Sequence, residues 1–441
     1  MIPILKLNNA KEQSRVDSLL LELALDPVAL ALGTGQRAKQ VALVQKILQD
    51  VAGRGDEALV ANSREFDDPD FSAAQIRVTP KEMVEAAGRV PADQSAAIRR
   101  SIAQVREYQT HVMPKDPPPL RRPGVELGLR FMPLESAGLY FPGGKAAYPS
   151  SLIMLAVPAQ VAGVSRIVVC TPPSKYGRSD LVLAACHELK LTDVYRAGGA
   201  AAIAAMAFGT ATIPKVDKIV GPGNIYVQLA KRALAGCVGI DGFLGPSEIL
   251  TIADDSGKPE FIAADLLAQA EHDPGSCFLL TTSKSLAETV RDEVEKQLST
   301  LPRRAAAEKA LKDHSAIIIG ESMDELISLS DRFAAEHVNV QTRDDQAVVK
   351  KLRNAGAIFV GPYSAVAAGD YVAGPSHCLP TNTTARFSSG ISVYEFFKRS
   401  SVERYDAEGL RADAGAIVTL AKAEGLEGHA RSVEARLEET E

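Results

Sequence analysis

The sequence predicts an α/β protein with two layers of comparable size, each built on a mostly parallel sheet. Short apolar runs alternate with helix-like periodicity over residues 134–245 and again over residues 248–360, which is typical of βαβ units. The chain has 441 residues, and because one compact core rarely holds that many, two or three domains are expected. Glycine-rich turns follow several of the strand-like runs, as they do where a backbone approaches a ligand.

The composition is that of an ordinary soluble globular protein, with 46% hydrophobic and 24% charged residues. A formal net charge of −6, an aromatic share of 5% and the absence of tryptophan argue against nucleic acid or an anionic membrane as a partner. The most apolar window, residues 151–170, is interrupted by Pro158, Gln160 and Arg166, so no membrane span is expected. The start of the chain has no secretory-signal pattern, and the five cysteines are scattered without a CxxC, so a cytoplasmic protein with free thiols is expected.

The first third of the chain is predicted to be helical. Residues 1–35 form an apolar helical lead-in that ends near Pro27, and helix-like periodicity follows at 36–53 and 80–108. The proline-rich stretch 114–123, which includes KDPPPLRRP, predicts an irregular, exposed connection.

Two alternating series follow, without a detectable sequence repeat. In the first, strands are predicted at 166–171, 194–196 and 218–220, and helices at 179–189, 203–208 and 224–234. In the second, strands are predicted at 248–253, 277–281, 315–319, 338–341 and 357–360, and helices at 261–271, 284–298, 324–335 and 345–354. The tail from residue 392 onward is charged and is predicted to be helical.

The best candidate for a phosphate site is the turn Gly-Pro-Gly at 221–223. It follows a strand-like run and precedes Asn224, a suitable helix N-cap, so a helix N-terminus would lie behind a glycine turn. Gly198 and Gly199 form a similar turn. No GxGxxG occurs, so the usual dinucleotide fingerprint is absent, and tight turns without a ligand explain the glycines equally well.

The adjacent pair Glu336 and His337 is the candidate for proton transfer. An imidazole that titrates near neutral pH can act as a general base, and a carboxylate beside it can take a second proton-transfer step. The pair follows a predicted helix and starts a predicted strand. Since neighbours in a strand point to opposite faces, we expect the two side chains to flank one pocket without touching each other. Most such pairs are surface or capping residues.

A set of nitrogen and oxygen ligands is suggested by residues from three distant segments. Gln269 and His272 lie three apart on a predicted helix and therefore share a face. Asp370 and His377 lie in a glycine- and proline-rich segment after the strand that ends at residue 360, and the carboxyl ends of parallel strands commonly hold binding sites. His429 opens a terminal helix. Two histidines, an aspartate and a glutamine suit Zn²⁺ with open positions, although capping alone would also explain His429.

Taken together, these segments resemble histidinol dehydrogenase, a family of NAD- and zinc-dependent enzymes. The order and spacing of the segments make the resemblance specific, and they cover nearly the whole chain. The segments are GLYFPGG (138–144), VPAQVAGV (157–164), KVDKIVGPGN (215–224), GPSEIL (245–250), DLLAQAEH (265–272), AAEH (334–337), GDYVAGPSH with LPT (369–381) and AEGLEGHA (423–430).

The resemblance implies a role for each matching residue. The implied ligands of one Zn²⁺ per subunit are Gln269, His272, Asp370 and His429. The implied acid–base pair is Glu336 and His337. The implied substrate-binding residues are Ser247, Gln269, His272, His337, Asp370, His377, Glu424 and His429. The implied NAD-binding positions are Tyr140, Ala201 and Asn224, with Ala201 where the family commonly has Gln.

The resemblance also implies two incomplete Rossmann-like domains, one inserted in the other, with small helical extensions at both ends. Residues 36–139 and 247–391 would form the domain with the zinc and catalytic residues, and residues 140–246 the NAD-binding domain. Residues 1–35 would be the N-terminal extension, and residues 392–441 would complete the site of the other subunit in a homodimer.

The implied reaction is the oxidation of L-histidinol to L-histidine through the aldehyde, with reduction of two NAD. Ser376 stands where Asn is usual, which leaves open a related dehydrogenase of another amino- or sulfo-alcohol. A zinc hydrolase would use a similar ligand set, but no HExxH is present. A non-catalytic binding module would not need both Glu336 and His337.

Overall fold

The structure, a computed structural model, describes residues 1–24, 26, 28, 34–143, 146–242, 245, 247–272 and 275–438. Gly144 and Pro246, which belong to motifs singled out above, lie outside these ranges, as does much of the second half of the predicted helical lead-in.

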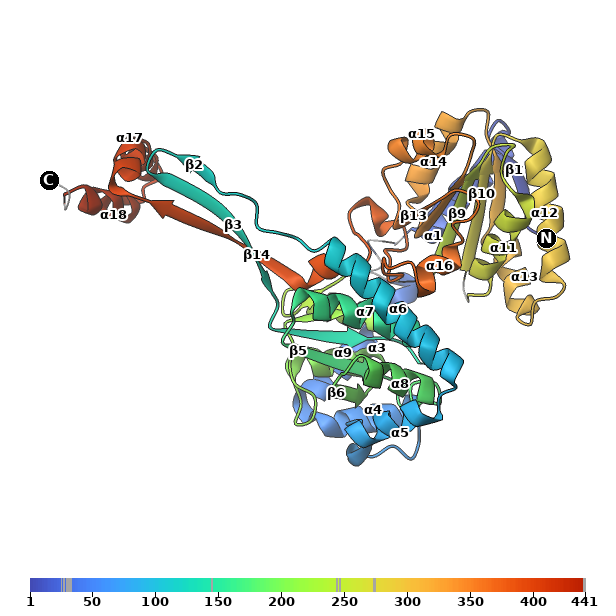
Figure 1. Ribbon diagram of the computed structural model, residues 1–441, viewed down its shortest axis with the longest axis horizontal. Coiled ribbons are helices and arrows are strands. Elements are labelled where there is room, and N and C mark those ends of the chain that lie inside the picture. Colours follow the sequence, from blue (N-terminus) through green and yellow to red (C-terminus); the bar gives the residue numbers. More distant parts are fainter. Residues whose placement is uncertain are drawn as a thin grey trace.

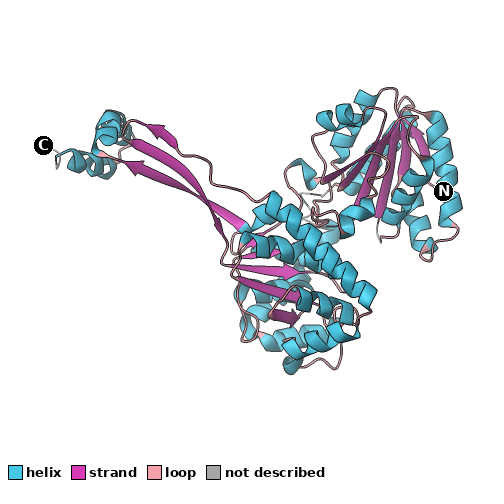
Figure 2. Cartoon of the chain, viewed as in Figure 1, coloured by secondary structure: helices cyan, strands magenta, loops and turns pink. Residues whose placement is uncertain are grey.

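The first of two parallel sheets has six strands in the order β1-β11-β10-β9-β12-β13. Its strands are β1 (Ile4–Lys6), β9 (Ser247–Ala253), β10 (Gly275–Thr281), β11 (Ala316–Ile319), β12 (His337–Gln341) and β13 (Ala357–Val360). Near-continuous apolar runs in these strands are expected, because helices cover both faces of a parallel sheet. Figure 2 shows that arrangement of helices and strands.

The second sheet has five parallel strands in the order β6-β5-β4-β7-β8. They are β4 (Ser136–Tyr140), β5 (Arg166–Thr171), β6 (Asp193–Arg196), β7 (Lys218–Val220) and β8 (Gly239–Ile240). Numbered along the chain, both sheets follow the doubly wound order 3-2-1-4-5, to which the first adds β1. The fold therefore repeats although the sequence does not, and the five-stranded sheet is inserted between β1 and β9.

Helices pack on both faces of the six-stranded sheet. One face is covered by α11 (Pro259–Ala270), α12 (Lys284–Leu298) and α13 (Arg304–Asp313), and the other by α1 (Ala10–Leu23), α14 (Met323–Phe333) and α15 (Asp345–Lys351). The short helix α16 (Val366–Tyr371) follows β13, and the 3-10 turns are η1 (Gly35–Arg37), η2 (Ala73–Gln75), η3 (Thr384–Arg386) and η4 (Val393–Phe396).

The helices of residues 38–111 pack on the five-stranded sheet, which corrects their expected grouping with residues 247–391. On one face lie α3 (Ala38–Arg54), α4 (Asp56–Phe66), α9 (Gly199–Phe208) and α10 (Ile225–Leu234), and on the other α5 (Pro80–Arg89), α6 (Ala92–His111), α7 (Pro149–Ala162) and α8 (Asp180–Glu188). The reason is where their apolar side chains pack. Val44 and Leu48 pack in the core around α9, and Ile98 and Val105 pack in the core around α7. Similarly, β1 makes the start of the chain part of the six-stranded sheet rather than a purely helical extension.

The C-terminal segment and the strands of residues 120–133 together form an arm that projects from the body (Figure 1). It consists of β2 (Leu120–Arg122), β3 (Val125–Pro133) and β14 (Phe397–Tyr405), followed by α17 (Ala407–Ala423) and α18 (Glu427–Glu438). The predictions of an irregular 114–123 segment and a wholly helical tail are thus wrong at β2 and β14. Both strands pair antiparallel with β3, β2 as its neighbour in a hairpin and β14 from the far end of the chain. The distant partner of β14 leaves no local signal in the sequence.

Within the described ranges, no helix combines the length and the apolar composition that crossing a bilayer requires.

A buried ion pair holds the glycine turn at 221–223. Lys231 and Asp241 are both buried and form an ion pair; Lys231 Nζ donates to the carbonyl of Gly221 at 3.0 Å, and Asp241 Oδ2 accepts from its N–H at 2.6 Å. Gly221 has φ +125°, and a Cβ there would lie 1.8 Å from the carbonyl oxygen of Tyr140. The turn therefore requires glycine and is fixed from behind by the ion pair.

We predict that Lys231→Met lowers the free energy of unfolding by roughly 3–5 kcal/mol, because it leaves the Asp241 carboxylate buried without its counter-ion. Urea unfolding measures this. The double variant Lys231→Met/Asp241→Asn should recover much of the loss. The exposed pair Arg54–Asp50 supplies the control, since Asp50→Asn should leave stability nearly unchanged. A similar loss in both single variants would contradict the account.

Candidate active site

Glu336 and His337 lie at the amino end of β12, at the edge where β9 also begins. Helix α14 ends at Phe333, and Ala334 adopts the left-handed conformation with φ 45°, which turns the chain into the strand. In register, His337 pairs with Ile249 of β9, so Ser247 and Glu248 at the start of β9 lie beside the pair. The site thus forms at the amino edge of the six-stranded sheet.

The Glu336 carboxylate is buried and hydrogen-bonded. Its Oε2 atom accepts from Ser247 Oγ at 2.5 Å and from the Glu248 N–H at 2.9 Å. Burial raises the pKa of Glu336 to about 8, while the two hydrogen bonds act in the opposite direction. A carboxyl group poised in this range can exchange a proton near neutral pH.

The His337 ring is oriented by the main chain of the same neighbour. Its Nδ1 atom lies 3.0 Å from the Glu248 carbonyl oxygen, a partner that can only accept, so Nδ1 carries the proton and Nε2 has the free lone pair. Nε2 lies 4.0 Å from Asp370 Oδ1. Burial lowers the pKa of His337, and the Asp370 charge opposes that shift, so at neutral pH the ring is a base.

Glu336 and His337 approach each other more closely than alternation along a strand predicts. Glu336 Oε2 and His337 Nδ1 are 3.5 Å apart, whereas opposite faces were expected. The reason is that β12 begins at His337, so Glu336 belongs to the turn before the strand.

Gln269 lies in the last turn of α11 as predicted, but the helix ends at Ala270 and His272 follows the C-cap Glu271, so the prediction of one shared helix face is wrong for His272. The Gln269 side chain is buried, and its Nε2 atom has no hydrogen-bond partner among the described residues. Because a flip of the amide exchanges its nitrogen and oxygen with little change in shape, the unpartnered atom can equally be the oxygen. Partial desolvation lowers the pKa of His272, and the Asp370 charge opposes the shift.

Asp370 belongs to α16, which returns the chain from the carboxyl end of β13 toward the amino edge of the sheet. The expected position in a loop at the carboxyl ends of the strands is therefore wrong. His377 follows seven residues later; its Nδ1 lies 2.7 Å from the Asp370 carbonyl oxygen and its Nε2 3.0 Å from Ser151 Oγ. Both of its ring nitrogens are engaged, and a substrate contact would have to replace Ser151.

Glu424 and His429 are exposed on the arm, far from the other proposed ligands (Figure 1). Among the described residues, no three His, Cys, Asp or Glu side chains converge as a metal site. Within one chain, Gln269, His272 and Asp370 lie at the amino edge of the six-stranded sheet, whereas His429 lies on the arm.

A cavity of about 1020 Å³ joins the two sheets. Ser247 and His272 line it from the six-stranded sheet, and Tyr140, Asn224 and residues 198–200 line it from the carboxyl edge of the five-stranded sheet. In that sheet the strand order reverses between β4 and β7, and such switch points hold ligands in doubly wound folds.

The three residues expected to bind the cofactor differ in whether they line the cavity. Asn224 caps α10 through Oδ1, as predicted, and lines the cavity. Tyr140 accepts a hydrogen bond from Gly199 N at 3.1 Å. A Cβ on Gly199 would meet no atom within 4 Å, so a ligand can approach this backbone. Ala201, in contrast, is buried in the core behind the cavity wall, where Ala200 takes its place, so the geometry gives Ala201 no direct contact.

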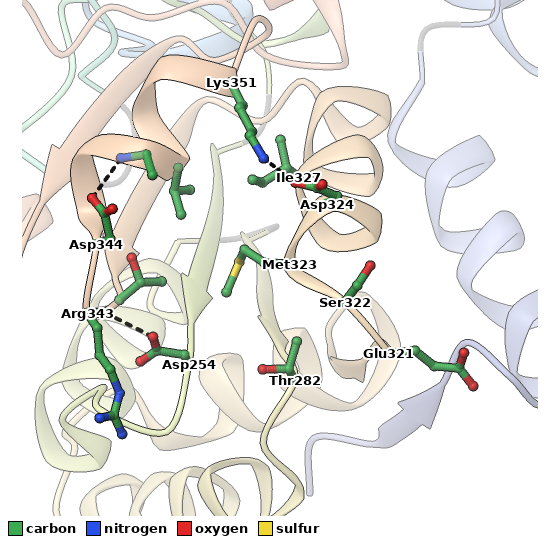
Figure 3. A pocket seen from close by; sticks show the side chains of 13 residues that line it. Asp254, Thr282, Glu321, Ser322, Met323, Asp324, Ile327, Arg343, Asp344 and Lys351 are labelled. Carbon is green, nitrogen blue, oxygen red and sulfur yellow. Dashed lines mark hydrogen bonds and ion pairs between the residues drawn. The ribbon is translucent and has the colours of Figure 1, made fainter.

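The corresponding switch point of the six-stranded sheet holds a separate cavity of about 520 Å³ (Figure 3). Its wall carries four carboxylates, of Asp254, Glu321, Asp324 and Asp344, and two cations that are each paired with a carboxylate, Arg343 with Asp255 and Lys351 with Asp324. Ser322 and Asp344 cap the adjacent helices with their own side chains. Carboxylates at capped helix ends oppose a phosphate, so this cavity does not suit a dinucleotide.

Sequence reasoning missed Glu248. Its main chain contacts both Glu336 and His337, and its own buried carboxyl accepts from Asn382 N at 2.8 Å. Burial raises the pKa of Glu248 to about 8. Its place directly after Ser247 in GPSEIL was the available signal, but main-chain contacts leave no trace in residue type.

Fold and site define an α/β enzyme with two Rossmann-like sheets, in which a buried acid–base pair lies behind Ser247, and Ser247 lines a cavity shared with the carboxyl edge of the second sheet. Comparisons with known proteins narrow this class. Residues 33–437 match the family model described as histidinol dehydrogenase. The chain belongs to the histidinol dehydrogenase family.

Individual relatives agree with the family match. The chain is 45% identical over 426 residues to histidinol dehydrogenase of Gluconobacter oxydans, covering 96% of this chain and 99% of the relative. It is 48% identical over 397 residues to that of a Synechococcus strain, covering 90% and 92%. The crystal structure of histidinol dehydrogenase from Elizabethkingia anophelis superposes with a TM-score of 0.91 at 33% identity, covering 100% of this chain and 98% of that one.

Proposed function

We propose that this protein oxidises L-histidinol to L-histidine through L-histidinaldehyde, as the final stage of histidine biosynthesis, with NAD as electron acceptor and one Zn²⁺ per subunit. The observation that carries the proposal is the buried pair Glu336–His337 directly behind Ser247, which donates to Glu336 and lines the cavity that the carboxyl edge of the second sheet also lines. Family membership supports the substrate. The proposed setting is the cytoplasm.

The residues present fit a zinc ion. Gln269 aims a buried amide atom without a partner, and His272 and Asp370 add an imidazole and a carboxylate, which are usual zinc ligands. We assign the remaining position to His429 of the partner subunit. When bound, zinc would hold the imidazole and amino nitrogens of the substrate and fix its hydroxymethyl carbon in the cleft.

The residues present also fit NAD. Gly199 offers an open backbone and α9 begins there without a side-chain cap. The Gly199 N–H donates to Tyr140, and the N–H groups that follow it in the first turn are the ones proposed to bind a phosphate. Tyr140 and Asn224 lie at the neighbouring strand and helix ends. When bound, NAD would accept one hydride in each of the two oxidations.

His337 is assigned the proton of the substrate hydroxyl. Its Nδ1 proton is held by the Glu248 carbonyl, so Nε2 is the atom that accepts. In the first oxidation the carbinol carbon loses a hydride and the oxygen loses its proton to Nε2, which yields the aldehyde.

Glu336 is assigned the water that adds to the aldehyde. Its carboxylate takes one proton of that water while the water oxygen bonds to the carbonyl carbon, and the carbonyl oxygen takes the proton that His337 Nε2 accepted in the first oxidation, giving the hydrate. The hydrate carbon then loses a hydride and one hydroxyl group loses its proton to His337 Nε2, which gives the carboxylic acid. The hydrogen bonds from Ser247 and Glu248 keep Glu336 oriented through both steps.

Ser247, His377 and Glu424 are proposed to bind the substrate, with Glu424 supplied in trans. The unusual Ser376 does not alter the cavity wall, because its Oγ accepts from Cys378 N at 3.1 Å within its own loop. Histidinol therefore remains the favoured substrate over another amino- or sulfo-alcohol.

The reaction is tested by counting NADH per L-histidinol consumed. We expect two NADH per substrate, loss of turnover on chelation and recovery with Zn²⁺. Hydrolytic activity without NADH would instead indicate a zinc hydrolase. No turnover from folded, zinc-loaded protein would reject the assigned substrate.

We further propose a homodimer in which each arm completes the site of the other subunit. The arm carries exposed Leu420 and Leu426 beside Glu424, and its tip lies far from its own cleft (Figure 1). An apolar exposed surface on a projecting segment is typical of an exchanged element.

Hybrid dimers test the exchange. Glu336→Gln and His429→Asn subunits, each with its own affinity tag, are co-expressed and the doubly tagged dimer is purified. One of the two sites then combines an intact body with an intact arm, so about half of the wild-type oxidation of L-histidinol to L-histidine should return. If each arm served its own subunit, the hybrid would be no more active than the parent variants.

A further inference from the structure

One carboxylate of the cavity is not used by the reaction described above. Asp67 follows the last residue of α4 and lines the cavity near Gly198, where a Cβ would lie 2.8 Å from Asp67 Oδ2. Within the described part of the chain, the Asp67 carboxylate has neither a hydrogen-bond partner nor a counter-ion, whereas the adjacent Asp68 pairs with Arg178 at 2.5 Å. A half-buried carboxylate facing a cavity is available to accept hydrogen bonds from a ligand.

The surroundings of Asp67 define the part of the ligand it would meet. Leu43 and Ile47 of α3 and Phe66 of α4 line the same cavity, and an apolar wall with an aromatic ring suits a purine base. His272 and Ser247, where the redox chemistry is proposed, belong to the other sheet. The nicotinamide end must therefore lie on that side, and the adenosine end is left for the wall formed by α3 and α4.

The charge of Asp67 selects among ligands. Burial, and then the charge of Asp68, raise the pKa of Asp67 to about 6, so the group is ionised at pH 7.5. An ionised carboxylate accepts hydrogen bonds from a vicinal diol and repels a phosphate monoester. The beginning of α9 at Gly198 and Gly199 lies next to it, and that positive end stabilises the ionised carboxylate.

We propose that Asp67 determines the nucleotide specificity of this protein: its carboxylate accepts hydrogen bonds from the adenosine ribose hydroxyls of NAD and excludes the 2′-phosphate of NADP. The inference rests on the proposed function in that NAD is the cofactor. Asp67 follows the N-terminal helix α4, so this residue lies outside the segment that supplies the strands of the five-stranded sheet.

Calorimetric titration of NAD, ADP-ribose and NADP into wild type, Asp67→Asn and Asp67→Ala tests the assignment by binding alone. We expect wild type to prefer NAD over NADP. Asp67→Asn should weaken both NAD and ADP-ribose about 10- to 100-fold, as for lost charge-assisted hydrogen bonds, without weakening NADP. The control is Asp70→Asn, which removes the same charge from an exposed position three residues away and should change nothing.

Three results would overturn the assignment. They are an unchanged ratio of NAD to NADP affinity, an effect on NAD without an effect on ADP-ribose, or the same change in the Asp70 control. Circular dichroism confirms folding of each variant, and Asp67→Ala separates loss of hydrogen bonds from loss of charge. Turnover of L-histidinol by wild type is measured in parallel: its absence would reject the proposed reaction, whereas turnover with unaltered selectivity would reject only the role of Asp67.

Discussion

The main chain of Glu248 is the contact on which the proposed chemistry depends. Its N–H donates to Glu336 and its carbonyl accepts from His337, so one peptide segment orients both proton-transfer groups. Because the segment belongs to β9, paired on both sides by β10 and β12, its position is fixed by two ladders of hydrogen bonds. The Glu336 and His337 side chains are therefore held in fixed orientations before a substrate binds, as a preorganised active site requires.

The two sheets share a topology but use opposite edges. The five-stranded sheet presents its carboxyl edge to the cleft, as doubly wound sheets usually do. The six-stranded sheet presents its amino edge, and its own switch point is lined by carboxylates. Joining unlike edges places the glycine-rich carboxyl edge of one sheet opposite the buried Glu336–His337 pair of the other, and in the proposed reaction each edge supplies what the other lacks.

Much of this fold could be predicted from the sequence, because buried parallel strands are apolar runs separated by amphipathic helices. Strands such as Arg166–Thr171 and Ala357–Val360 were located to the residue. What depends on distant partners could not be predicted. Strand β14 pairs with β3 far away in the chain, α16 carries Asp370 back to the unexpected edge, and the helices of residues 38–111 choose their sheet by tertiary packing. At the site, the periodicity placed Gln269 correctly on α11, whereas His272 lies beyond the helix end and Glu248 acts through main-chain atoms that every residue has. The sequence did not indicate a binding role for Asp67, because a single carboxylate after a helix is usually exposed to solvent at the helix end.

The separate roles proposed for Glu336 and His337 are tested most directly with the Glu336→Gln variant, assayed separately on L-histidinol and on L-histidinaldehyde. Glutamine keeps the shape of the side chain but cannot take a proton from water. Oxidation of the alcohol to the aldehyde should persist, while oxidation of the aldehyde should fall about 10²- to 10⁴-fold, the usual contribution of a general base. Equal loss of both steps would contradict the assignment of Glu336 to the water and leave His337 without a separate role.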